Sequence, residues 1–161
     1  PELVRLDDRG SFAWLADRAE PIERASAALA VAGGCLVADP VDFPGLDAAL
    51  AAIGPVVGVV TLLDRHQRDA AALAARHGAP RLTPRALGGT GVPVEGVEER
   101  TVVSVRGWHE ALLWLPDRRL LVCAETVGTG RFYRARPAKA RRTGRRRASG
   151  CTASASAGRA R

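Results

Sequence analysis

The segment from residue 55 to residue 78, PVVGVVTLLDRHQRDAAALAARHG, constrains the fold of this 161-residue chain more than any other. A nine-residue apolar run, rich in Val and Leu, stops at Asp64, and an Ala-rich stretch then runs to Gly78. The pattern predicts a buried strand at 55–63, a polar loop, and a helix at about 67–77 that ends in a left-handed glycine cap. Polar side chains in such a loop sit at the end of a rigid scaffold, where functional sites are often built.

The rest of the first 130 residues alternates between strand and helix patterns. The turn sequences DDRG at 7–10 and PDR at 116–118 each indicate a hairpin, and the Gly- and Pro-rich segment 79–100 reads as loop with a short strand near Arg81. Further strands are predicted at 2–6, 11–16, 35–38, 101–105, 111–115 and 119–124, and a further helix at 44–53. Residues 1–130 are therefore predicted to form a layered α/β or α+β domain.

The positive charge of the chain is concentrated at its C-terminal end. The formal net charge is +7, but residues 131–161 hold eleven of the 24 basic residues and none of the 17 acidic ones. Residues 1–130 are therefore mildly acidic, with 13 basic groups against 17 acidic ones. Because the segment 131–161 has few large apolar residues, we expect it to be a disordered basic tail.

Two interpretations of this tail stay open. A basic arm binds nucleic acid by neutralising phosphates. The alternative is a tail without a selected function, such as the product of a shifted reading frame in a GC-rich gene. No aromatic residue follows Tyr133, so the tail offers no side chain on which bases would stack. Nucleic acid is therefore expected as a partner only through this tail.

Cysteine use and hydropathy favour a reducing, cytoplasmic setting. Cys35, Cys123 and Cys151 are widely spaced, and the first two lie in apolar segments where a buried, reduced thiol is expected. No Cys-x-x-Cys pair indicates a zinc ribbon, and no apolar run approaches the roughly 18–20 residues that cross a bilayer. The chain has no Met, even at position 1, so we expect a fragment or a processed chain.

Four polar residues at the ends of predicted elements are candidate metal ligands: His66, Asp69, His109 and Glu125. Imidazole and carboxylate are the usual ligands of zinc and of other divalent metals. Each residue also has a simpler structural interpretation. His66 fits a solvated loop, Asp69 complements the N-terminus of a helix, and Glu125 could pair with Arg118 or Arg119.

The order of these segments resembles the metallo-β-lactamase superfamily. In that family a strand ends in Thr-His-x-His-x-Asp-His and runs into a helix, and a later Gly-His segment precedes a hairpin whose second strand ends in Gly-Asp. Here VVTLLDRHQRDAAALAARHGAPR follows Asp39-Pro40, and VVSVRGWHEALLWLPDRRLLVCAETVG supplies the hairpin, with Ala124-Glu125 at the Gly-Asp position. The resemblance covers residues 11–130. It implies an αββα sandwich, incomplete in this chain, with zinc at the sheet edge that activates water for hydrolysis.

Matched position by position, the first part of the family's metal motif has degenerated. When Asp69 stands on the motif's Asp, Arg65 and Gln67 occupy the first two histidine positions and Ala70 the last. His66 falls on the variable position between them. A guanidinium cannot coordinate a cation, and Gln is a poor zinc ligand beside imidazole.

The second part of the motif is also altered. Gly107 is followed by Trp108, and the histidine comes one position later, at His109. Glu125 replaces the bridging Asp with a longer carboxylate, and no histidine follows it. A two-zinc site of the family type is therefore not expected.

Three functional hypotheses follow. The first is a metallo-β-lactamase-fold, hydrolase-like protein with weak or no activity. In it, His66, Asp69, His109 and Glu125 would hold one zinc or other divalent metal, and Asp69 would orient or deprotonate the bound water. The second is a non-catalytic scaffold that binds an anionic ligand through Arg65, Arg68 and Arg106. The third is nucleic-acid binding through the tail. The sequence does not decide whether the chain is an enzyme.

Overall fold

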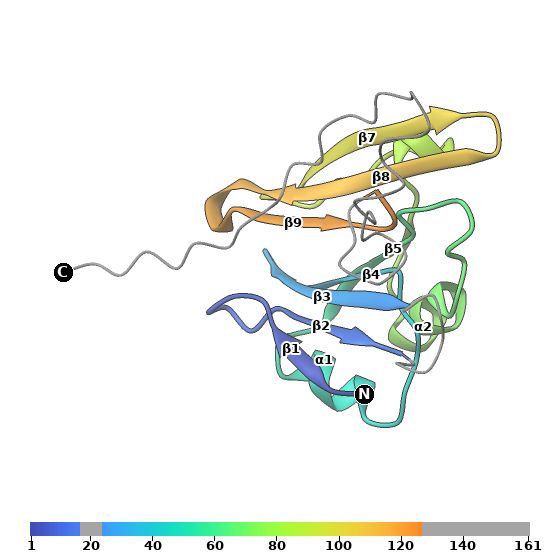
Figure 1. Cartoon of the computed structure of the whole chain (residues 1–161). Coiled ribbons are helices and arrows are strands. Elements are labelled where there is room, and N and C mark those ends of the chain that lie inside the picture. Colours follow the sequence, from blue (N-terminus) through green and yellow to red (C-terminus); the bar gives the residue numbers. More distant parts are fainter. Residues whose placement is uncertain (17–23, 127–161) are drawn as a thin grey trace, which may run out of the picture.

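The computed structural model describes residues 1–16 and 24–126. These residues form a mixed α+β fold with two β-sheets and two α-helices (Figure 1). The general class predicted from the sequence is confirmed, whereas the metallo-β-lactamase sandwich stays a prediction. No helix in this part of the chain is both long and apolar enough to cross a membrane. The predicted basic tail lies outside the described residues.

The larger sheet contains six strands whose order in space, β1-β2-β3-β4-β5-β6, is also their order along the chain. They are β1 (Leu3–Arg5), β2 (Phe12–Leu15), β3 (Ala25–Val31), β4 (Gly34–Ala38), β5 (Val56–Val60) and β6 (Arg81–Leu82). The first four are antiparallel neighbours, and β4, β5 and β6 run parallel. Parallel neighbours need a crossover connection. The helices α1 (Leu46–Ala51) and α2 (Ala70–His77) lie in these two crossovers.

The smaller sheet is an antiparallel meander of β7 (Glu98–Val105), β8 (Trp108–Leu115) and β9 (Leu120–Cys123). A short 3₁₀ helix at Pro116–Arg118 joins β8 to β9, and another lies at Arg85–Leu87. The two sheets are tied together just after β5. The Ala111 amide donates to the Leu62 carbonyl at 2.9 Å, and the Asp64 amide donates to the His109 carbonyl at 3.1 Å.

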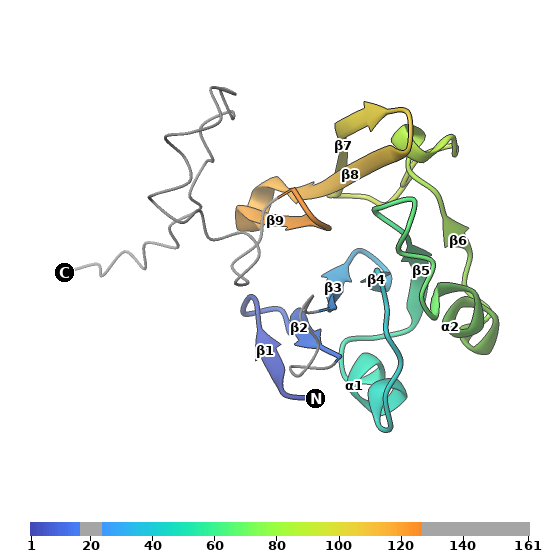
Figure 2. The same ribbon diagram turned by 45° about the vertical axis from the view of Figure 1, so that its right-hand side comes forward.

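The larger sheet is covered on both faces, because alternate side chains of a strand point to opposite sides. One face packs against both helices and the other against β8 and its neighbours (Figure 2). The helix-side core comprises Phe12, Trp14, Ala28, Cys35, Val37, Leu46, Leu50, Val59, Ala70, Leu73 and Ala74. The core between the sheets comprises Ala27, Leu29, Leu36, Ala38, Val60, Leu62, Val92, Leu113 and Leu115. The described residues therefore form a helix layer and two sheet layers.

Most predicted elements are present with shifted ends. The predicted helix at 67–77 is α2, which begins at Ala70, and its cap Gly78 has a φ of 60° as expected. The predicted strand at 101–105 begins earlier, at Glu98, because its polar residues pair with β8 on an exposed edge. The predicted turn at 116–118 is a 3₁₀ helix.

Strand β3 was missed by the sequence analysis. Its sequence, ASAALAV, is rich in alanine, which has a low intrinsic preference for strands. Its conformation is instead set by hydrogen bonding to β2 on one side and β4 on the other. The turn into β4 uses Gly33 and Gly34, whose φ angles are 81° and 150°. A Cβ at Gly34 would lie 2.0 Å from the Pro55 carbonyl oxygen, so only glycine fits there.

Cys35 has a free thiol, as predicted. Cys35 is fully buried in the helix-side core, whereas Cys123 is only partly buried. Burial raises the pKa of the Cys35 thiol to about 12, because the thiolate would be poorly solvated there. Cys35 is therefore a packing residue. Cys151 lies outside the described residues.

A buried ion pair joins the β1–β2 turn of the larger sheet to the β8–β9 turn of the smaller one. Arg118 Nη1 donates to Asp7 Oδ2 at 2.8 Å, and both side chains are almost fully buried. The other carboxylate oxygen of Asp7 accepts the backbone amides of Arg9 and Ser11. Burial alone would raise the pKa of Asp7, but hydrogen bonds from Ser11, Arg118 and Arg9 outweigh it and lower that pKa.

We predict that Asp7→Ala lowers the free energy of unfolding by about 3 kcal/mol, because within the described residues it leaves the buried Arg118 guanidinium with only the longer, 3.5 Å ion pair to the exposed Asp117. Chemical denaturation measures this loss. Glu98→Ala, which removes the exposed pair with Arg100, is the control and should cost less than about 1 kcal/mol. The contribution of Asp7 should be complete above its unfolded pKa of 3.8 and lost as the pH falls through the lower folded value. Equal losses in both variants would contradict this prediction.

Candidate functional site

Asp39 anchors a polar cluster at the end of β4. It is buried and has a φ of 46°, a left-handed conformation that Asp tolerates better than most residues. Its Oδ1 accepts the Leu62 amide at 2.8 Å, in the segment that follows β5. Its own amide donates to the Val60 carbonyl at 2.9 Å. Asp39 therefore fixes the path of the backbone just beyond the ends of β4 and β5, which are parallel neighbours.

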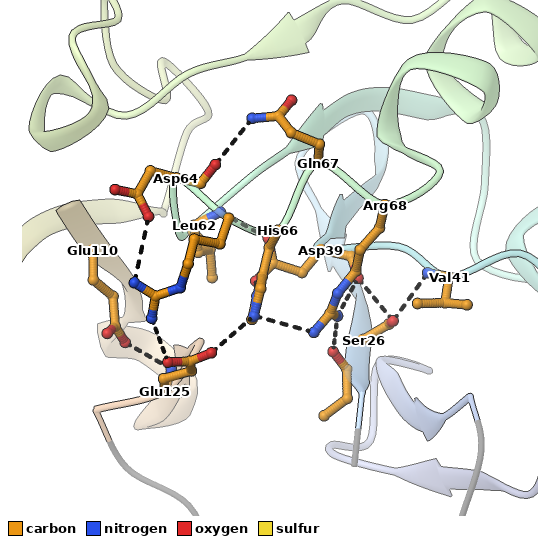
Figure 3. Close-up of polar contacts among 12 residues, drawn as sticks. Ser26, Asp39, Val41, Leu62, Asp64, His66, Gln67, Arg68, Glu110 and Glu125 are labelled. Carbon is orange, nitrogen blue, oxygen red and sulfur yellow. Dashed lines mark hydrogen bonds and ion pairs between the residues drawn. The ribbon is translucent and has the colours of Figure 1, made fainter. Parts of the chain in front are cut away.

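The imidazole of His66 lies between two carboxylates (Figure 3). Its Nδ1 is 2.9 Å from Asp39 Oδ2, and its Nε2 is 3.4 Å from Glu125 Oε1. The side chain is only 13% exposed, so the solvated loop histidine considered above is not what the structure shows. Because Asp39 accepts from Nδ1, the ring orientation is fixed and Nε2 faces the rim of the cluster.

Arg68 forms the inner wall of the cluster. Its Nη1 donates to the carbonyls of Ala25 and Asp39, the latter at 2.8 Å, and its Nη2 lies 3.4 Å from His66 Nε2. Burial lowers the pKa of the Arg68 guanidinium, and the charge of Asp39 opposes that shift. Its φ of 39° is a left-handed conformation that costs a non-glycine residue about 1–2 kcal/mol. The cluster therefore contains two strained backbone positions, as functional sites often do.

Arg65 lies at the outer rim. Its Nη2 donates to Glu125 Oε2 at 2.8 Å, and its guanidinium carbon lies 5.6 Å from the ring centroid of Trp108. Glu125 thus bridges Arg65 and His66 with its two carboxylate oxygens. Sequence analysis offered a pairing of Glu125 with Arg118 or Arg119, but Arg118 pairs with Asp7 instead.

Glu110 holds the backbone beside Glu125 in place. Its side chain is fully buried, and Oε1 accepts the amides of Glu125 and Thr126, both at 2.9 Å. Its Oε2 accepts from Trp108 Nε1 at 3.2 Å. A buried carboxylate with three donors is satisfied without a cation. Glu110 is a positioning residue that the sequence analysis did not single out.

The other two predicted ligands make contacts outside this cluster. Asp69 stands at the N-terminus of α2, and its Oδ2 accepts the Asp42 amide at 2.8 Å. The His109 ring lies 3.3 Å from Ser104 Oγ, while its backbone bonds to Asp64 in both directions. Of the four predicted ligands, the structure brings only His66 and Glu125 into contact.

The residues of the cluster do not fit a metal in this arrangement. A metal needs several lone pairs aimed at one point, whereas His66 turns its two nitrogens toward different carboxylates. Arg68 lies against Nε2, and its positive charge would repel a cation. Within residues 1–16 and 24–126, no three His, Cys, Asp or Glu side chains form a group that could hold a metal ion. Metal binding by His66, Asp69, His109 and Glu125 stays a prediction.

A surface depression with a volume of about 460 Å³ lies elsewhere, between α1 and α2. Arg76 spans its wall and bonds to Asp42 and Asp47. The hydrogen bond from Arg76 lowers the pKa of Asp42. Because these charges are satisfied by one another on the surface, the depression offers less specific chemistry than the His66 cluster.

The chain was also compared with known proteins. A scan against protein-family models finds no match, and neither does a search of the curated proteins. The chemistry of the cluster therefore has to be argued from its own geometry.

We predict that Asp39→Ala lowers the free energy of unfolding by about 2–4 kcal/mol. The change leaves the buried Leu62 amide without its acceptor and places alanine in a left-handed conformation. Asp39→Asn keeps an acceptor oxygen and tolerates that conformation, so it should cost only about 1 kcal/mol. Chemical denaturation of the two variants provides the comparison, and equal losses would contradict the assigned role of Asp39.

Proposed function

We propose that this chain is a metallo-β-lactamase-like domain whose degenerate metal position now holds guanidinium groups, and that it binds a small anionic ligand without catalysis. The two facing sheets with helices on one outer face support the first part. The second part rests on the Glu125 carboxylate, which lies between Arg65 and His66.

The Glu125 carboxylate occupies the position that the carboxylate or phosphate of a ligand would take. Its two oxygens meet Arg65 Nη2 at 2.8 Å and His66 Nε2 at 3.4 Å. The Arg65 guanidinium is a good receptor for a carboxylate or phosphate. A free anion that displaced Glu125 would meet the same guanidinium and lie beside the His66 ring.

Exchanging Glu125 for a free anion would leave the charge of the cluster unchanged. Arg65 and Arg68 supply two positive charges, which face the carboxylates of Asp39, Asp64 and Glu125. Asp39 is buried and committed to Leu62 and His66, so it cannot leave. If Glu125 swings away, Arg65 loses its nearest carboxylate, and a ligand anion that takes this place restores the contact.

Displacing Glu125 should cost little. The Arg65 side chain is 50% exposed and that of Glu125 is 26% exposed. Ion pairs of this kind at a surface contribute about 0.2–1 kcal/mol, because water screens them and both side chains lose freedom. Competition from Glu125 therefore weakens ligand binding only slightly.

Arg65→Ala tests the site by removing the outer donor. We predict that it weakens the binding of acetate or phosphate about 10- to 100-fold, the usual range for a hydrogen bond to a charged group. Titrations followed by NMR measure these affinities. Arg85→Ala is the matched control, because it removes an equal charge from a side chain that is 72% exposed and lies outside the cluster. Equal weakening in both variants would indicate only general charge attraction.

Glu125→Gln should have the opposite effect. Removing the competing carboxylate leaves Arg65 available, so we predict about 2- to 5-fold tighter binding of the same anions. If neither the wild-type protein nor Glu125→Gln binds these anions in a saturable way, the proposed site is excluded.

The metal prediction is tested on the same purified protein. Elemental analysis for zinc, iron and manganese should give less than one metal ion per chain, because guanidinium groups flank the imidazole. A stoichiometric metal that survives dialysis and is lost in His66→Ala would overturn the anion proposal. That result would favour the predicted metal-assisted hydrolysis instead.

A further inference from the structure

We propose that the ligand of the anion site carries a flat apolar body beside its acidic group, as an aromatic carboxylate does. This inference rests on the anion binding proposed above and names the class of ligand. It is carried by two exposed apolar side chains next to Arg65, at the tip of the β7–β8 hairpin.

Val105 and Trp108 form an exposed apolar surface at this tip. They face each other across the hairpin as a cross-strand pair. Val105 is 57% exposed and Trp108 is 38% exposed. The turn itself consists of Arg106 and Gly107, and the pair flanks it on the two strands. What distinguishes this pair from other exposed apolar residues is that Trp108 lies against the guanidinium of Arg65.

The surface is directly joined to the anion site through Arg65. The guanidinium carbon lies 5.6 Å from the Trp108 ring centroid, and Arg65 Nη1 approaches the Gly107 carbonyl at 3.5 Å. The other end of the same guanidinium holds Glu125. A carboxylate bound in place of Glu125 would therefore have Arg65 and then the indole beside it.

The indole is also held in place before any ligand arrives. Trp108 Nε1 donates to Glu110 Oε2, and Glu110 is fully buried. A fixed aromatic surface binds a flat ring with little loss of freedom. Aromatic groups also stack on a guanidinium that already contacts an indole. Acetate and phosphate lack such a body and would use only the charged half of the site.

Three probes of increasing ring size test this inference: acetate, benzoate and 2-naphthoate. They share one carboxylate, so differences in their affinity report on the apolar body. In the wild-type chain we expect 2-naphthoate to bind about 3- to 10-fold more tightly than acetate, with benzoate between them. Titrations followed by NMR measure all three.

Variants at Trp108 assign the preference to this side chain. Trp108→Ala should abolish the advantage of 2-naphthoate, so that the ratio of its affinity to that of acetate falls to about 1. Trp108→Phe keeps an aromatic ring and should keep most of the advantage. Leu121→Ala, which removes another exposed apolar side chain on β9, is the control and should change neither affinity. Thermal unfolding of each variant verifies that it is folded.

The outcomes separate this inference from the proposed function. If all three probes bind equally to the wild-type chain and Arg65→Ala abolishes binding, the anion site stands and the apolar subsite is excluded. If Trp108→Ala weakens all three probes by the same factor, Trp108 only supports Arg65, and the inference is overturned. If no probe binds the wild-type chain or Glu125→Gln, the proposed function fails with it.

Discussion

The carboxylate of Asp39 is the contact on which the rest of this cluster depends. One oxygen fixes the backbone of Leu62 beyond β5, and the other fixes the ring of His66. The backbone carbonyl of the same residue accepts from Arg68 and from the Ser26 hydroxyl. Because Asp39 is buried, each of these bonds acts in a region of low dielectric, where an unpaired group would be costly. The strained left-handed backbone at this position is therefore maintained by several contacts at once.

Charge compensation decides what such a cluster can bind. Two guanidinium groups approach the imidazole and its carboxylates, and together they form a network of opposite charges. A cation would add positive charge to this network, whereas an anion can exchange with Glu125 at the rim. The difference between Arg65 and Asp39 is one of burial. The half-exposed arginine can change partners cheaply, while the buried carboxylate cannot.

Local patterns predicted much of the fold. The apolar run at 56–60, the helix that ends at Gly78 and the hairpin of β8 and β9 all have clear local signals. Strand β3 has no such local signal, because alanine has a low intrinsic preference for strands. Its conformation is decided by the pairing with β2 and β4. In the site, His66 and Glu125 were predicted together, but Asp39 was noted only as the end of a strand. Glu110 reads as an ordinary strand residue, and its burial depends on backbone amides fifteen and sixteen residues further along the chain.

The sequence by itself determined the mixed α+β class, the position of most elements and the polar loop that carries Arg65, His66 and Arg68. These features follow from periodicity, capping and composition, which act between residues close together in the chain. Only the tertiary structure decided which polar groups meet. Asp39 and His66 are 27 positions apart, and Arg65 and Glu125 are 60 apart, so their pairing depends on how the two sheets are joined. The same geometry directs the side chain of Asp69 to a neighbouring loop and that of His109 to Ser104. Distances between side chains from different strands are set by sheet pairing and core packing, and no local pattern in the sequence contains them.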